Sequence, residues 1–111
     1  MAEATPRRGE IWLVQFGPSI GGEMQKTRPA LVLSNDTANE LLNRIQVVPI
    51  SSQIARLYPA EAFVTLNGER RKAMADQIAT VSKLHLQRLM GHLSPRDMQA
   101  VARVVTLHLS L

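Results

Sequence analysis

The hydrophobic positions in the first half of the chain form short runs separated by glycine, proline and polar residues. Residues 10–16 (EIWLVQF) alternate between apolar and polar, which predicts a β-strand. Residues 28–34 (RPALVLS) are almost continuously apolar, as in a strand near the middle of a sheet. Residues 45–51 (IQVVPIS) predict a third strand with an edge or a bulge at Pro49, because proline donates no ladder hydrogen bond.

The second half continues with the same short spacing. Residues 60–67 (AEAFVTLN) alternate as a strand and end at an Asn67-Gly68 turn, although the charged GERRK that follows indicates a connection longer than a two-residue hairpin. Residues 75–82 (ADQIATVS) predict a fifth strand. Residues 83–93 (KLHLQRLMGHL) are typical of a short helical or irregular segment closed by Gly91.

Two helices are expected. Asn35 and Asp36 are suited to cap a short helix over residues 37–44, and Ser94-Pro95 is a typical start for the last element. That element carries one apolar stripe at helical spacing, formed by Met98, Val101, Ala102, Val105 and Leu109. Several short strands with one such helix predict an α+β fold, mainly β, in which a small curled antiparallel barrel packs against a C-terminal helix.

A glycine-hinged loop over residues 17–27 (GPSIGGEMQKT) precedes the second strand and has no apolar period. It carries Glu23 and Lys26 and leads directly to Arg28. Pro29 favours an extended backbone at Arg28, which fixes where the arginine side chain leaves the sheet. A loop of charged residues anchored on a rigid strand is a typical way to present groups to a ligand.

Length and composition indicate one domain over residues 1–111, with residues 1–8 as a flexible arm. The chain has no cysteine, which removes disulfides, thiol nucleophiles and thiolate metal sites. The first residues lack the apolar core of a signal peptide, and no apolar run approaches the roughly 20 residues that span a bilayer. We therefore expect a cytoplasmic protein that does not contact a membrane.

The formal net charge is +4, and ten of the thirteen basic residues are arginine. The planar guanidinium group matches a phosphate with two parallel hydrogen bonds, so this composition favours a polyanionic partner. Scattered arginines that only keep the surface soluble are the alternative, and composition does not separate the two.

Four blocks of sequence together resemble the MazF/PemK family of bacterial toxin endoribonucleases. They are RRGEIWLVQF, GGEMQKTRPALVLS, VVPISS and MADQIATV, in the order and spacing of that family, and the resemblance runs from about Arg8 to the C-terminus. The resemblance implies an SH3-like barrel of the MazF/CcdB kind. It also implies that Arg28, in the R-P pair, is a principal catalytic residue and that Ser51 is the second.

The activity that this resemblance implies is sequence-selective cleavage of single-stranded RNA by the substrate's own 2′-hydroxyl, leaving a 2′,3′-cyclic phosphate and a 5′-hydroxyl. Such chemistry needs neither a metal nor another cofactor. An arginine fork at the phosphorane would stabilise the transition state more than the ground state. The expected RNA contacts are Glu23, Lys26, Ser52, Gln53, Asp76 and Gln77. The expected partners are RNA, a second copy in a homodimer and an acidic MazE-like antitoxin.

Several alternatives stay open. His85, His92 and His108 would suit an acid–base ribonuclease, but none is in the glycine loop or beside Ser51, and no recognised metal-ligand spacing occurs. Trp12 is expected in the core or a subunit interface. The GERRKA run is expected to be a solvated turn, with binding to backbone phosphates as the alternative. A non-enzymatic, CcdB-like toxin that binds DNA gyrase is the main rival function. A weakened relative that only binds RNA or antitoxin is a third, because Met24 stands where the family often has glutamine.

Overall fold

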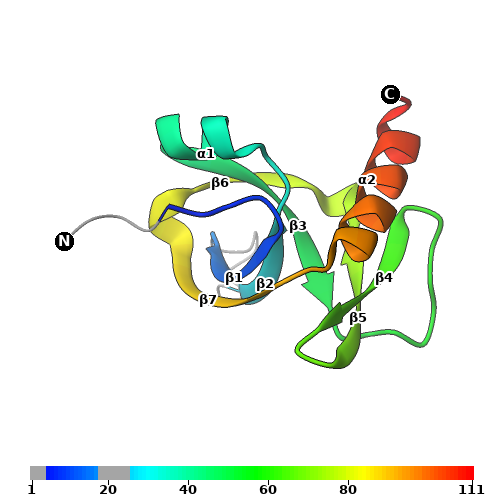
Figure 1. Ribbon diagram of the computed structural model, residues 1–111. Helices are drawn as coiled ribbons and strands as arrows, with labels where there is room; N and C mark the ends of the chain where they lie inside the picture. Colours follow the sequence, from blue (N-terminus) through cyan, green and yellow to red (C-terminus); the bar gives the residue numbers. More distant parts are fainter. Residues whose placement is uncertain (1–4, 18–25) are drawn as a thin grey trace.

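The computed structural model describes residues 5–17 and 26–111 (Figure 1). Short strands dominate the chain, and one long helix ends it. The elements in chain order are β1 (Glu10–Phe16), β2 (Lys26–Val32), α1 (Asp36–Leu41), β3 (Arg44–Ser51), β4 (Glu61–Leu66), β5 (Glu69–Met74), the 3₁₀ helix η1 (Ala75–Gln77), β6 (Ala79–Ser82), the 3₁₀ helix η2 (Lys83–His85), β7 (Leu86–His92) and α2 (Pro95–Leu109).

The strands of the described residues form one antiparallel sheet in the order β4-β5-β3-β2-β1-β7. β3 is the hub, because it pairs with β2 along one side and with β6 and then β5 along the other. Figure 1 shows β6 and β7 curling past β1 and β2, and the hydrogen-bonded ladder stays open where η2 joins β6 to β7. The predicted α+β class, mainly β with a C-terminal helix, is confirmed.

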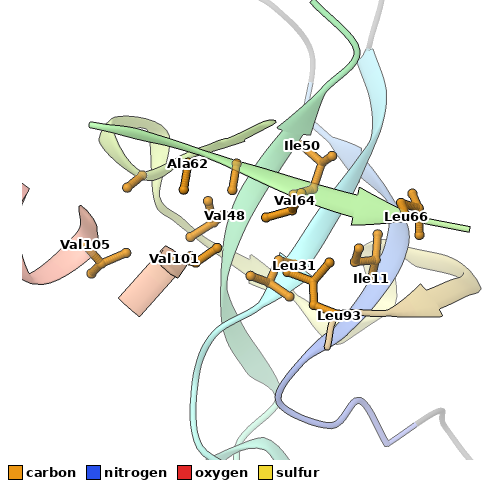
Figure 2. Close-up of a cluster of buried hydrophobic side chains, with 12 residues drawn as sticks. Ile11, Leu31, Val48, Ile50, Ala62, Val64, Leu66, Leu93, Val101 and Val105 are labelled. Atoms are coloured by element: carbon orange, nitrogen blue, oxygen red, sulfur yellow. The ribbon is translucent and has the colours of Figure 1, made fainter. Parts of the chain in front are cut away.

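The central strands bury both of their faces, which explains their nearly continuous apolar sequence. One face lies inside the curl, in a cluster formed by Trp12, Val14, Ala30, Val32, Ile45, Val47 and Val81. The other face packs against β4, β5 and α2 (Figure 2). That second cluster includes Ile11, Leu31, Val48, Ile50, Val64, Val101 and Val105. Adjacent residues of one strand therefore belong to different cores.

The C-terminal helix forms as its sequence predicts. Ser94 is the N-cap and accepts a hydrogen bond from the backbone N–H of Asp97 at 3.1 Å, and Pro95 occupies the first turn. Asp97 in turn accepts a hydrogen bond from the backbone N–H of Thr65 on β4. Val101 and Val105 are buried, whereas Leu109 at the end of the predicted stripe is exposed.

The connection between β4 and β5 corrects the sequence-based prediction. Asn67 and Gly68 both have positive φ, at 51° and 82°, and Leu66 pairs directly with Glu69. This is a two-residue hairpin of the kind that Asn-Gly favours, and not a longer connection. The charged GERRK run is therefore the start of strand β5 and not a solvated turn.

Residues 75–93 differ more from the prediction. The fifth predicted strand is shortened to β6, because Ala75–Gln77 form η1, and the segment expected to be helical or irregular is mostly strand β7. Gly91 does not close a helix but lies inside β7, where a Cβ would come within 3.1 Å of the Leu66 side chain. β7 is stabilised by pairing with β1, a partner roughly eighty positions away that local periodicity does not reveal.

Residues Pro6 to Arg8 are held against the rest of the fold. Pro6 is fully buried, the backbone N–H of Arg8 donates to Asp36 at 2.6 Å, and the Arg7 guanidinium lies 3.4 Å from the same carboxylate. A flexible arm over residues 1–8 is therefore wrong for Pro6 to Arg8, and residues 1–4 lie outside the described part.

Candidate functional site

Strand register brings Arg28 and Ser51 to the same place. β2 and β3 are antiparallel, with Ala30 opposite Pro49, so two residues further along the same register Arg28 lies opposite Ser51. Side chains two positions apart share a face of a strand. Ala30 and Val47 face the inside of the curl, so Arg28 and Ser51 extend that face to the end of the sheet.

An open pocket of about 260 Å³ lies at this end of the sheet. Four of the residues predicted for the site line it, together with one arginine that was not predicted. The lining residues are Arg28, Pro29, Ile50, Ser51, Ser52, Gln53 and Arg71. The structure thus gathers Arg28, Ser51, Ser52 and Gln53, which come from two separate segments of the chain.

Arg71 lines the pocket although it was not among the predicted site residues, and the GERRKA run that contains it was expected to contact phosphates only as an alternative to a solvated turn. Arg71 belongs to β5, and its neighbour Lys72 pairs with Ser51 of β3. This pairing places Arg71 beside the end of β3. Its side chain is 26% exposed, and its guanidinium lies 3.7 Å from the Glu69 carboxylate. The signal was present in the Asn67-Gly68 turn, because a two-residue hairpin there places GERRK on a strand.

Ser51 both forms a local turn and lines the pocket. Its hydroxyl oxygen accepts a hydrogen bond from the backbone N–H of Gln53 at 3.0 Å, which makes the local turn that a serine at a strand end often forms. That bond uses one lone pair and leaves the O–H free to donate. The turn therefore orients the hydroxyl at the pocket.

The pocket is rich in groups that bind anions. Two arginines, two serines and a glutamine line it, and guanidinium forks match phosphate oxygens. Among the described residues, those that line it include no carboxylate and no imidazole. The arrangement can hold a phosphodiester and stabilise negative charge that develops on it.

The other predicted site residues lie elsewhere or beyond the described part. Asp76 and Gln77 are exposed on η1, which packs against α2 and β3, and they do not line this pocket. The Gln77 amide donates to the sulfur of Met74 at 3.6 Å. Glu23 and the glycine loop over residues 18–25 lie outside the described residues, and for Lys26 only the backbone is described, at the start of β2.

The histidines lie apart from this pocket. His85 is on η2, His92 lines a separate cavity with Arg7 and Arg8, and His108 lines a small cavity near the end of α2. Within residues 5–17 and 26–111, no three His, Asp or Glu side chains gather as metal ligands would. No helix in the same ranges is long and apolar enough to span a bilayer.

A buried ion pair lies next to the pocket. The Lys72 ammonium donates to the Glu61 carboxylate at 2.9 Å, and the two side chains are 7% and 8% exposed. Burial alone raises the pKa of the Glu61 carboxyl. Hydrogen bonds from Lys72 and from the backbone N–H of Tyr58, together with the Lys72 charge, outweigh burial and hold that pKa below its ordinary value.

Comparison with known proteins matches this chain to a family of toxins. Residues 7–109 match the family model of the PemK-like, MazF-like toxins of type II toxin–antitoxin systems. The chain belongs to this family, which confirms the resemblance seen in the sequence.

The relatives cover nearly the whole chain. It is 39% identical to the endoribonuclease MazF9 of Mycobacterium tuberculosis, over 95% of this chain and 97% of that protein. It is 26% identical to the endoribonuclease MazF of Staphylococcus saprophyticus, over 95% and 92%. Among solved structures, MazF of Deinococcus radiodurans has a TM-score of 0.82 at 24% identity, over 97% of this chain and 99% of that one. This last likeness shows the shared fold.

Proposed function

We propose that this protein is a toxin endoribonuclease that cleaves single-stranded RNA at the pocket of Arg28 and Ser51. The observation that carries the proposal is the convergence of Arg28, Ser51 and Arg71 from three strands on one pocket. Membership of the PemK-like, MazF-like family supports it, as do relatives that are named endoribonucleases.

The resemblance to MazF-like toxins implies cleavage by the substrate's own 2′-hydroxyl, and the residues of the pocket suit this chemistry. The 2′-oxygen of the RNA forms a bond to the adjacent phosphorus, and the bond from phosphorus to the 5′-oxygen of the next nucleotide breaks. The products are a 2′,3′-cyclic phosphate and a 5′-hydroxyl. Because RNA supplies its own nucleophile, neither a metal nor a thiol is needed.

Each residue has a separate role in this mechanism. The Arg28 guanidinium binds the non-bridging oxygens, where charge is greatest in the phosphorane, and so stabilises the transition state more than the substrate. Ser51 donates to the scissile phosphate and positions it, since an unperturbed hydroxyl is a poor base. Arg71 adds a second cation that holds the backbone of the RNA.

The remaining predicted contacts extend the RNA path. Ser52 and Gln53 are at the rim of the pocket and can contact the neighbouring nucleotides. Glu23 and Lys26 would approach from the glycine loop, with Glu23 as a substrate contact or base and Lys26 as a phosphate contact. Asp76 and Gln77 would contact bases away from the pocket.

We further propose that the protein acts in the cytoplasm as a homodimer and is inhibited by an acidic antitoxin. A mycobacterial relative of this fold is known in complex with its cognate antitoxin, and MazF of Deinococcus radiodurans is known with MazE. A chain of net charge +4 attracts both RNA and an acidic segment. Competition for the arginine pocket would then be the means of inhibition.

The decisive test is the substitution Arg28→Ala, assayed on purified single-stranded RNA in the presence of EDTA. Loss of one preorganised donor to the transition state is expected to lower kcat about 10²- to 10³-fold, with an unchanged melting temperature. The matched control is Arg44→Ala, an exposed arginine at the opposite end of β3, roughly 20 Å from Ser51 along the strand. It is expected to cleave at the parent rate.

The same experiment separates the alternatives. Equal rates in Arg28→Ala and the parent would remove Arg28 from the mechanism. Complete inhibition of the parent by EDTA would contradict metal independence. A parent that cleaves no RNA but binds a DNA gyrase subunit would favour the CcdB-like function, and one that only binds RNA would favour a weakened relative. Mapping the cut ends on a long RNA gives the recognised sequence and the product ends together.

A further inference from the structure

A second, smaller pocket adjoins the first. Its volume is about 200 Å³, and it is lined by Gln53, Ala55, Arg56, Tyr58 and Lys72. Gln53 lines both pockets. Lys72 pairs with Ser51 across strands β3 and β5. The same pair of strands therefore contributes the catalytic serine to the first pocket and Lys72 to the second. The two cavities are therefore parts of one continuous surface.

The second pocket has the chemistry of a site for a flat, polar ring. Tyr58 is 52% exposed, although a tyrosine ring has a large apolar area to bury. An Arg56 guanidinium nitrogen lies 3.5 Å from the Tyr58 hydroxyl, and the Gln53 amide supplies both donors and an acceptor. Nucleobases bind to proteins by stacking on such rings and by hydrogen bonds from such polar groups.

The segment that carries Tyr58 is irregular but firmly held. The Lys72 ammonium donates to the backbone carbonyl of Arg56 at 2.9 Å, and the backbone N–H of Tyr58 donates to the Glu61 carboxylate at 2.9 Å. The backbone N–H of Glu61 donates back to the carbonyl of Tyr58 at 2.9 Å. The buried Lys72–Glu61 pair thus holds both ends of the irregular Arg56–Tyr58 segment, so the backbone that carries the exposed ring is preorganised.

We infer that this second pocket is a nucleobase subsite for a nucleotide next to the cleaved phosphodiester. Tyr58 stacks on the base, while Gln53 and Arg56 contact its edge or its phosphate. Lys72 and Glu61 are positioning residues that hold the backbone that carries the ring. The inference rests on the proposed function, since it places one base relative to the phosphate held by Arg28 and Ser51.

The test uses the full chain and the RNA site that it cuts. A short RNA containing that site is synthesised intact and with one abasic nucleotide at each position flanking the cleaved bond. Tyr58→Leu removes the ring and is expected to lower kcat/KM about 5- to 100-fold on intact RNA. One of the abasic RNAs lacks the base that Tyr58 would contact. On that RNA the same substitution is expected to change kcat/KM by less than about 2-fold, because the stacking contact is already absent.

Tyr58→Phe is the matched control, because it keeps the ring and loses only a hydroxyl whose contact is long at 3.5 Å. It is expected to keep most of the parent's preference for intact over abasic RNA, because stacking needs the ring and not the hydroxyl. If Tyr58→Leu fails to fold, the same comparison of intact and abasic RNAs is made with Arg56→Ala, which retains the backbone contact with Lys72.

Two results overturn the subsite while the proposed function stands. One is parent-like cleavage of intact RNA by folded Tyr58→Leu. The other is an equal loss on the intact RNA and on every abasic RNA, which would indicate a general structural effect. If the parent cleaves no RNA, the proposed function fails and the subsite fails with it.

Discussion

At the scale of single residues, the site depends on where two strands end. Arg28 lies in the first half of β2, just before Pro29, and Ser51 is the last residue of β3, so both side chains lie toward one end of paired strands. Strands hold side chains more rigidly than loops do, which suits groups that must meet one phosphate. The Ser51 turn bond to Gln53 adds a further constraint on the hydroxyl.

The Ser51 hydroxyl gives a residue-scale prediction. A hydrogen bond to a charged group contributes about 1.5 to 3 kcal/mol, so Ser51→Ala is expected to lower kcat about 10- to 100-fold. Ser51→Thr keeps the hydroxyl and is expected to retain most of the rate. The measurement is single-turnover cleavage of the mapped RNA together with thermal unfolding. A variant that loses stability but cleaves at the parent rate would show that Ser51 only shapes the turn.

At the scale of elements, the hairpin between β4 and β5 controls how the pocket is assembled. It places Arg71 and Lys72 beside Ser51, and it depends on two consecutive residues with positive φ. Glycine adopts this conformation without steric cost, and asparagine tolerates it better than most residues. The Asn67-Gly68 turn therefore reverses the chain, so that the charged run pairs with β4 as strand β5.

Gly68→Ala is the matching test of this element. At a φ of 82° a Cβ costs roughly 1 to 2 kcal/mol, so we expect the free energy of unfolding to fall by about 1 kcal/mol. Gly17→Ala is the control, because Gly17 has no positive φ and nothing within 4 Å of an added Cβ. Urea unfolding followed by the fluorescence of buried Trp12 compares the two. Equal unfolding midpoints would mean that alanine adopts the positive φ at position 68 without strain.

At the scale of the whole molecule, the central strands serve two cores at once. Ile11 belongs to the cluster under α2 and Trp12 to the cluster inside the curl, so β1 links the two. Close packing on both faces leaves the strand ends as the free surface where polar groups can gather. The Lys72–Glu61 pair lies at the edge of this arrangement and joins β4, β5 and the Arg56–Tyr58 segment.

This pair predicts how global stability depends on pH. The pKa of Glu61 lies below 4.5 in the folded protein, so its ionised form stabilises the fold. The contribution is complete above about pH 4.5 and is lost as pH falls through the folded-state pKa. Glu61→Gln leaves the Lys72 charge buried without its partner and is expected to cost about 3 kcal/mol at pH 7. The difference from the parent should shrink at lower pH.

Urea unfolding of both proteins between pH 7 and pH 3 measures this difference. Glu69→Gln is the control, because its exposed carboxylate lies 3.7 Å from Arg71, and loss of such a surface pair changes stability by less than about 1 kcal/mol. A difference between Glu61→Gln and the parent that is constant across the range would contradict the role of the ionised carboxylate.

Local signals in the sequence were sufficient for much of the fold. The alternation in β1, the caps of α1 and α2, and the interruption of pairing around Pro49 all depend on residues close in the chain. The prediction of Arg28 and Ser51 as site residues came instead from the resemblance of the R-P pair and the VVPIS block to the MazF/PemK family. Side-chain period, capping and proline geometry act over a few residues, so they can be recognised without the fold.

Tertiary structure alone decided which of these segments meet. β7 is a strand because β1 pairs with it, and Arg71 reaches the pocket because β5 returns along β3. The Lys72–Glu61 pair that holds the Arg56–Tyr58 segment joins positions up to sixteen residues apart. The chain itself determined the strands and the chemistry of its arginines and hydroxyls. Strand register, which is set by long-range pairing and by burial of both sheet faces, determined that they share one surface.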